Sequence, residues 1–180
     1  MRLRWVPILA LAAAVPAAGQ QMQHQEHKGD HLVAGMRSLQ QQVAGFLVKA
    51  AEQMPEADYG FKPTPDVRSF GELIGHVANA QYMFCSGATG EASPNKTDFE
   101  KVMSKAQIVQ GIKDGFAFCE KAYQMDDMKA MEDVKFFGQD GTRLWVLAFN
   151  TAHNNEHYGN VVTYMRLKGM VPPSSQRSGM

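Results

Sequence analysis

The apolar residues of this chain recur at intervals of three and four over four long segments, a spacing typical of amphipathic helices. In the first segment, residues 31–54, they form one stripe that a helix would turn toward a core. The stripe consists of Leu32, Met36, Leu39, Val43, Phe46, Leu47 and Ala50. Asp30 is a suitable N-cap for this helix, and Pro55 ends the pattern because proline cannot continue a helix.

A second helix is predicted to begin after Ser69 and to continue to about Phe84. Ser69 and Glu72 match a capping box, in which the serine hydroxyl and the glutamate carboxylate each accept a hydrogen bond from a backbone N–H. The apolar face consists of Leu73, Val77, Ala80 and Phe84. His76 lies at the edge of that face, so its imidazole is available for chemistry as well as for packing.

A third helix is predicted behind Ser104, which forms a second capping-box candidate together with Gln107. Its apolar face consists of Ile108, Ile112, Phe116, Cys119 and Tyr123. Residues 58–67 and 87–96 contain glycine and proline, and we expect both segments to be loops on either side of the second helix.

The fourth and longest predicted helix runs from Arg143 to Lys168, about 39 Å at a rise of 1.5 Å per residue. Thr142 is a suitable N-cap, and Gly169 supplies the left-handed residue that ends many helices. The preceding segment, residues 126–142, is predicted to be a loop or a small irregular region that could hold one extended stretch.

Four predicted helices and no convincing series of strands indicate one all-α domain, a four-helix bundle over residues 31–175 with a tail at residues 176–180. The chain has 180 residues, of which 44% are hydrophobic and 20% charged, values that exclude wholesale disorder. Eighteen basic residues balance eighteen acidic ones, and this zero net charge argues against nucleic acid as a partner, which attracts a basic excess or stripe.

The start of the chain has the pattern of a secretory signal peptide. Two arginines are followed by an apolar stretch from Trp5 to Val15 and then by small residues that end at Gly19. We expect residues 1–19 to be a signal peptide that is cleaved near Gly19. Cleavage would leave no membrane span and would place the protein in a bacterial periplasm or outside the cell. An uncleaved N-terminal anchor is the alternative.

Residues 20–30 are polar and lack periodicity, so we expect a flexible lead before the bundle. His24, His27 and His31 give this part of the chain a possible loose affinity for metal ions. The simpler interpretation is a solvated tail.

The chain contains two cysteines, Cys85 and Cys119, which are too few for a disulfide scaffold or a four-cysteine zinc site. An exported protein can form disulfides. The two residues could form one bridge between two helices or remain two buried thiols, and the sequence leaves both possibilities open.

The histidines of the last predicted helix carry the strongest chemical signal. His153 and His157 are four residues apart, which places both imidazoles on one helix face, one turn apart. Further along, that face carries Asn160, Val161 and Tyr164, so we expect it to turn toward the bundle interior. His76 offers a third imidazole from the second helix. Three histidine ligands leave coordination positions open for water or substrate, which is the pattern of a catalytic metal site.

Each of these residues also has a simpler interpretation. The three histidines could be hydrogen-bonded core residues, and Glu156 could orient a histidine, act as a base or be solvated. Asn160 could support a ligand or satisfy a backbone group. The pattern from His153 to His157 also matches the H-x-x-E-H motif of inverted zinc peptidases. That architecture needs a downstream acidic ligand, and no Asp or Glu follows His157.

Three motifs together resemble the DinB-like superfamily: SFGELIGHV at residues 69–77, HNNEHYGN at residues 153–160 and YMRLKGMVPP at residues 164–173. The resemblance covers roughly residues 31 to 175. It implies a four-helix bundle with an up-down-down-up order of helices. It also implies a divalent metal, zinc or nickel, held by three histidines, and a homodimer. The ligands would be His76, His153 and His157.

Members of this family are labelled metal-dependent hydrolases, or resemble thiol S-transferases and thiol-dependent isomerases that use low-molecular-weight thiols. The resemblance therefore implies one of these activities. Asn160 stands where we expect glutamine in many relatives. The sequence therefore predicts an exported, metal-dependent hydrolase or thiol S-transferase that acts on an unknown small molecule, with Glu156 as a candidate for proton transfer. The alternatives are a non-catalytic metal-binding protein and an interaction protein of the cell envelope whose histidines are only packed.

Overall fold

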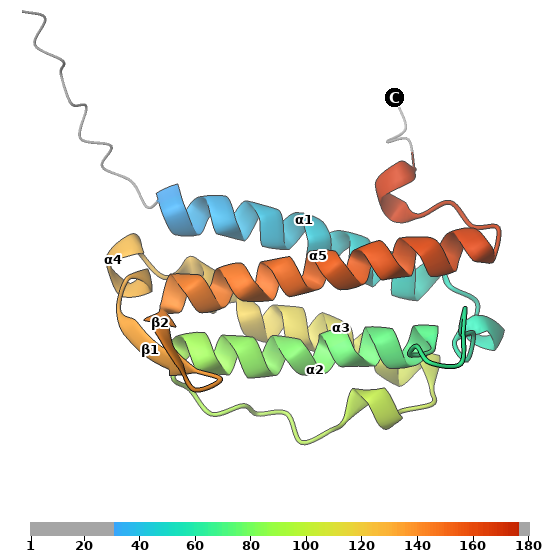
Figure 1. Ribbon diagram of the computed structural model, residues 1–180, viewed down its shortest axis with the longest axis horizontal. Helices are drawn as coiled ribbons and strands as arrows, with labels where there is room; N and C mark the ends of the chain where they lie inside the picture. Colours follow the sequence, from blue (N-terminus) through green and yellow to red (C-terminus); the bar gives the residue numbers. More distant parts are fainter. Residues whose placement is uncertain (1–30, 177–180) are drawn as a thin grey trace, which may run out of the picture.

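The computed structural model describes residues 31–176 and is mostly helical, with four long helices that lie side by side (Figure 1). These are α1 (His31–Gln53), α2 (Phe70–Thr89), α3 (Lys105–Glu120) and α5 (Arg143–Leu167). Shorter elements connect them: the helix α4 (Asp127–Ala130) and the 3-10 helices η1 (Glu56–Asp58), η2 (Phe99–Lys101), η3 (Ala122–Gln124) and η4 (Pro173–Ser175). The predicted signal peptide, polar lead and Asp30 cap, and residues 177–180 of the tail, lie outside the described residues.

The described helices give no candidate for a transmembrane segment, because none of those between residues 31 and 176 is both long and apolar enough.

The predicted caps of α2 and α5 are confirmed. The Ser69 side chain accepts a hydrogen bond from the Glu72 N–H, and the Glu72 carboxylate accepts one from the Ser69 N–H at 2.6 Å. Thr142 accepts from the Trp145 N–H at the start of α5. At α3, the Ser104 side chain accepts from the Gln107 N–H, although the reciprocal half of a capping box is not part of the described contacts.

Helix α2 is longer than its sequence predicts. It continues past Phe84 to Thr89 and ends at Gly90, whose φ of 78° is left-handed. We expected a loop from Gly87 onward, and that prediction is wrong. A Cβ at Gly87 would lie 2.6 Å from the ring of Phe136, so this glycine serves close packing inside the helix and does not break it.

The expectation of a purely α-helical domain is also incomplete, because a small antiparallel hairpin precedes α5. Strands β1 (Asp133–Phe136) and β2 (Gln139–Thr142) pair with Phe136 opposite Gln139. Phe137 and Gly138 form the turn with φ values of 50° and 77°. Two left-handed residues match the twist of a two-residue hairpin. The sequence did not reveal this turn because phenylalanine is an unusual residue in that conformation.

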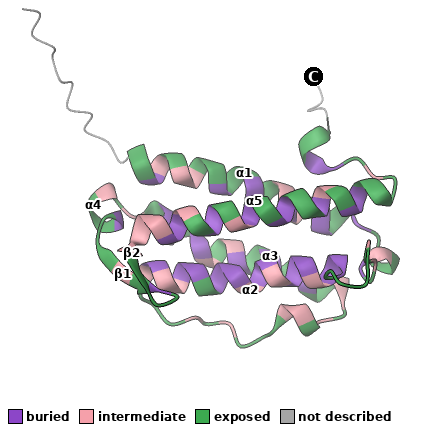
Figure 2. Ribbon diagram, viewed as in Figure 1, coloured by how far each residue is buried: buried purple, intermediate pink, exposed green. Residues whose placement is uncertain are grey.

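The buried face of α1 is rotated from the predicted stripe. Leu32 and Leu39 are 53% and 54% exposed, whereas Val33 and Gln40 are buried. In Figure 2, green exposed stretches are frequent along α1, whereas purple buried stretches dominate α2. The buried positions of this helix are Val33, Gln40, Val43, Leu47, Ala50 and Ala51. Gln40 is polar but buried, so a prediction from apolar residues alone misplaces the buried face of α1.

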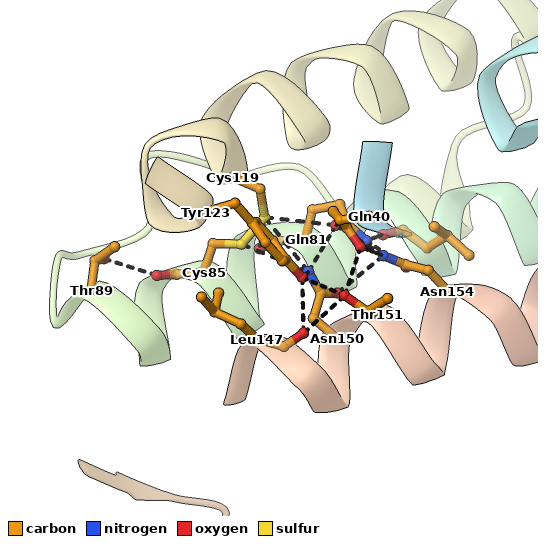
Figure 3. Close-up of a disulfide and its surroundings, with 11 residues drawn as sticks. Gln40, Gln81, Cys85, Thr89, Cys119, Tyr123, Leu147, Asn150, Thr151 and Asn154 are labelled. Carbon is orange, nitrogen blue, oxygen red and sulfur yellow. Dashed lines mark hydrogen bonds between the residues drawn. A yellow bond between two sulfur atoms is a disulfide. The ribbon is translucent and has the colours of Figure 1, made fainter. Parts of the chain in front are cut away.

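Cys85 of α2 and Cys119 of α3 form a disulfide, with Cα atoms 5.3 Å apart (Figure 3). Beside it lies a buried polar cluster from three helices and η3. The cluster consists of Gln40, Gln81, Tyr123, Asn150, Thr151 and Asn154. The sequence left the state of the cysteines open, and the structure contains the bridge.

Candidate metal centre

The structure brings the three predicted histidines together from two helices. His76 lies on α2, and His153 and His157 lie one turn apart on α5. The Nε2 atoms of His76 and His153 are 3.1 Å apart, and those of His153 and His157 are 3.0 Å apart. Each residue offers a ring nitrogen, and the three ligand atoms lie within 4.8 Å of one another.

Burial keeps two of these imidazoles neutral. It lowers the pKa of His153 to about 4, with smaller contributions from the positive charges that His157 and His76 could carry. Burial is also the main cause that lowers the pKa of His157. Only a neutral imidazole has a lone pair to donate to a metal ion. Both side chains of α5 are therefore in the ligand form at neutral pH.

His76 has a partner that the sequence analysis missed. Its Nδ1 lies 2.7 Å from Oε1 of Glu100, a residue of η2. The Nε of Arg68 donates to the other oxygen of that carboxylate at 2.9 Å. Burial alone would raise the pKa of Glu100, but the hydrogen bonds from Arg68 and His76 outweigh it and hold that pKa below its ordinary value.

The other two histidines differ from His76 at this nitrogen. The Nδ1 atoms of His153 and His157 are buried and have no hydrogen-bond partner within the described part of the chain. Their rings are held by packing: the ring of His153 lies 5.4 Å from that of Phe84, and the two histidine rings are 4.3 Å apart in an edge-to-face arrangement.

A pocket of about 980 Å³ opens beside His157. Its walls come from α5, from α2 and the loop before it, and from η2, and they carry both positive and negative charges. Among the lining residues are Arg68, Glu100, Glu156, His157, Asn160 and Tyr164. The site is thus open to small molecules on one side, as a catalytic site requires.

Glu156 and Asn160 lie on the pocket wall and are both exposed. We expected Asn160 on the interior face of α5, and that prediction is wrong, although Val161 and Tyr164 are buried as expected. The buried amide of this helix is Asn154, which donates to the Gln40 side chain at 3.1 Å. Sequence reasoning missed Asn154 because it stands next to His153 and not on the same helix face.

The donor set of this site suits a transition metal. Three imidazoles, with no carboxylate among them, are typical ligands of zinc, nickel, copper or iron and not of magnesium or calcium. The Nε2 of His153 lies 3.1 Å from that of His76 and 3.0 Å from that of His157, so the three nitrogens cannot all carry protons and lone pairs are available there. The residues therefore fit a divalent metal ion.

Comparison with known proteins gives a family match over the part of the chain that holds this site. The family model of the DinB superfamily matches residues 40–161. No curated protein matches the sequence significantly.

Solved structures with the same fold include two DinB-like proteins from bacilli. The protein from Bacillus cereus ATCC 10987 has a TM-score of 0.70 and 19% identity, and the match covers 78% of this chain and 95% of that one. The protein from Bacillus subtilis has a TM-score of 0.61 and 23% identity over 79% of this chain and 99% of that one.

A third solved structure is the mycothiol-dependent maleylpyruvate isomerase. It has a TM-score of 0.58 and 12% identity, and the match covers 72% of this chain and 60% of the isomerase. At these identities, the three likenesses establish the fold alone.

Proposed function

Because this chain belongs to the DinB superfamily, we propose that it is a metal-dependent enzyme, a hydrolase or a thiol S-transferase that acts on a small molecule. The observation that carries the proposal is the convergence of three histidine Nε2 atoms beside an open pocket. His76, His153 and His157 bind the metal in this proposal, and the donor set favours zinc or nickel.

A divalent metal bound there supplies Lewis acidity, which lowers the pKa of a coordinated water or thiol. The chain's own part is to present three imidazole ligands, to leave the pocket side open and to bind substrate on the pocket wall. Glu156 is exposed on that wall, one residue before His157. We propose that its carboxylate accepts a proton from a nucleophile in the pocket.

The thiol S-transferase branch of the proposal is supported by the fold shared with a mycothiol-dependent enzyme. The hydrolase branch rests on the same open metal site, since a bound water and a bound thiol are activated by the same effect. The pocket wall carries Arg68, Lys62, Glu156 and Glu100, so we propose a polar substrate in either case.

The proposal includes an up-down-down-up order of the four long helices. Two sets of contacts support it. Helices α2 and α3 are parallel, because Gly71 lies beside Ile108 near their starts and Cys85 is bonded to Cys119 near their ends. Helices α1 and α5 are also parallel, because Gln40 contacts Asn154 and Phe46, further along α1, contacts Tyr158, further along α5. The segment of residues 90–104 is long enough to connect the parallel helices α2 and α3.

We also propose export through the N-terminal signal peptide, and a homodimer. Disulfides persist in oxidising compartments, so the Cys85–Cys119 bridge supports a location outside the cytosol. N-terminal sequencing of protein from a periplasmic extract, and sedimentation of the mature chain, test these two points.

The enzyme proposal is tested with the mature chain loaded with zinc or nickel. It is assayed on carboxylic and phosphoric ester substrates, and on the transfer of small thiols to electrophiles. We expect turnover that His153→Ala abolishes, while helical circular dichroism and the turnover of a His24→Ala/His27→Ala control remain. A chain that binds metal but turns over no substrate of either class would favour the non-catalytic metal-binding alternative.

A further inference from the structure

The η2 segment, which carries Glu100, packs in close contact with both α2 and α3. A Cβ at Gly75 of α2 would lie 2.3 Å from the carbonyl oxygen of Phe99, so the η2 backbone rests directly on α2. The ring of Phe99 occupies the space that a Cβ of Gly111 on α3 would need, at 2.3 Å. Two glycines thus let η2 approach both helices closely.

Polar contacts fix the same segment in register. The Asn79 side chain donates to Asp98 Oδ1 at 2.8 Å and accepts from the Phe99 N–H at 3.0 Å. Asp98 in turn caps η2 by accepting from the Glu100 N–H. Asn79 lies one turn after His76 on α2, so the helix that carries a ligand also anchors the segment that contacts it.

The consequence of this docking is the contact at His76. A carboxylate only accepts hydrogen bonds, so the 2.7 Å contact places the proton of neutral His76 on Nδ1. The lone pair is then on Nε2, the nitrogen that faces His153 at 3.1 Å. Arg68 holds the second oxygen of Glu100 and leaves its first oxygen directed at the ring.

Among the three histidines, only His76 has an Nδ1 hydrogen-bond partner within residues 31–176. It comes from a different helix, and its side chain is 25% exposed. The Nδ1 atoms of His153 and His157 are buried and have no partner in the described chain, although the rings of all three histidines pack against one another. A partly exposed imidazole without a hydrogen bond would exchange tautomers and rotate, and both changes weaken a metal ligand.

We propose that Glu100 is a positioning residue of the metal site, which fixes the tautomer and orientation of His76, and that Arg68 and the docked η2 segment hold Glu100 in place. The inference rests on the proposed function because it concerns the same three histidines. It adds a fourth residue to the site, and its first readout needs no metal.

The first test records ring nitrogen resonances of the metal-free mature chain by long-range ¹H–¹⁵N correlation at pH 7.5. In the wild type, we expect His76 as the Nδ1–H tautomer. In Glu100→Ala we expect a mixture of tautomers, and in Glu100→Gln a return toward Nδ1–H, because the amide oxygen still accepts. An unchanged His76 tautomer in Glu100→Ala would overturn the inference.

The second test measures zinc affinity by competition with a chromogenic chelator. We expect Glu100→Ala to bind zinc roughly 10- to 100-fold more weakly than the wild type, and Glu100→Gln to recover part of the loss. Glu72→Ala is the structural control, since it removes the α2 capping box without touching His76. It should lower the melting temperature and leave zinc affinity within about twofold.

An equal loss of zinc affinity in Glu72→Ala and Glu100→Ala would show a general loosening of α2 and would overturn the inference. If the wild type takes up no zinc or nickel, the proposed function fails. The tautomer measurement then decides on Glu100 alone, so the two failures are distinguishable.

Discussion

At the scale of single residues, Gln81 shows how this core accommodates polar groups. Its side chain is fully buried on α2. The amide nitrogen donates to Asn154 Oδ1 at 2.8 Å, and the amide oxygen accepts from Gln40 at 3.2 Å and from Asn150 at 3.1 Å. One side chain therefore satisfies polar groups on two other helices. Asn154, which belongs to this cluster, directly follows His153 in α5.

Replacing Gln81 with leucine should destabilise the protein, because Gln40 and Asn150 would stay buried without their acceptor. We expect the free energy of unfolding to fall by about 3 kcal/mol, measured by urea denaturation with the disulfide intact. The exposed Gln107→Leu is the matched control and should change it by less than about 0.5 kcal/mol. A loss below about 1 kcal/mol in Gln81→Leu would mean that the cluster is rearranged easily.

The candidate site was partly predictable at this scale. His153 and His157 follow from spacing on one helix, and His76 follows from its place at the edge of an apolar face. Glu100 could not be found this way, because it is 24 residues from His76 in a segment without periodicity. Its role depends on the glycine contacts that dock η2, and those become visible only in three dimensions.

At the scale of elements, the four long helices were predictable because their signals are local. Capping residues and apolar spacing lie within the segments that they define, as Ser69 and Thr142 show. The hairpin before α5 was not predictable, because its turn uses Phe137 in a left-handed conformation. The rotation of α1 was missed because the buried Gln40 belongs to a polar cluster that spans three helices.

The contact between η2 and α2 gives an element-scale prediction. Gly75→Ala should displace η2, because the new Cβ would meet the Phe99 backbone at 2.3 Å. We expect a loss of about 1–3 kcal/mol in the free energy of unfolding and weaker zinc binding, since Glu100 moves with η2.

The matched control for that change is Gly45→Ala on α1, where a Cβ would meet nothing within 4 Å. Alanine is more favourable than glycine inside a helix, so this variant should gain up to about 1 kcal/mol in the free energy of unfolding and keep its zinc affinity. Equal stability changes in the two variants would contradict the close docking of η2.

The start of α1 gives a second prediction at this scale. Asp127 of α4 accepts hydrogen bonds from the N–H groups of Val33 and Leu32 at 2.9 and 3.0 Å. Both bonds lower the pKa of Asp127, and the bond from Val33 contributes most. A lowered folded-state pKa stabilises the protein above the unfolded value, near 4. That contribution disappears as the pH falls through the folded pKa.

Asp127→Ala should therefore have a lower melting temperature than the wild type at pH 7. The gap between the two melting temperatures should narrow as the pH falls below about 4. Calorimetry across that range measures the gap, with the exposed Asp133→Ala as the control. A gap that stays constant down to pH 3 would contradict a charged cap at this helix start.

At the scale of the whole molecule, the disulfide closes a loop of the chain that includes η2. Cys85 and Cys119 are 34 residues apart, so the bridge restrains the unfolded chain. Cys85→Ala/Cys119→Ala should lose about 3–4 kcal/mol of unfolding free energy in urea, and the reduced wild type should lose a similar amount. No difference between oxidised and reduced protein would mean that the bridge does not form in solution.

A metal centre built from three histidines of two helices requires that the purified protein contain metal, and metal content can be measured. Elemental mass spectrometry of the untagged mature chain should find about one zinc or nickel per chain. A His153→Ala/His157→Ala variant should have none, while His24→Ala/His27→Ala should keep the wild-type content. Metal absent from the wild type even after zinc or nickel is added, or retained in full by the His153→Ala/His157→Ala variant, would rule out the three-histidine metal centre.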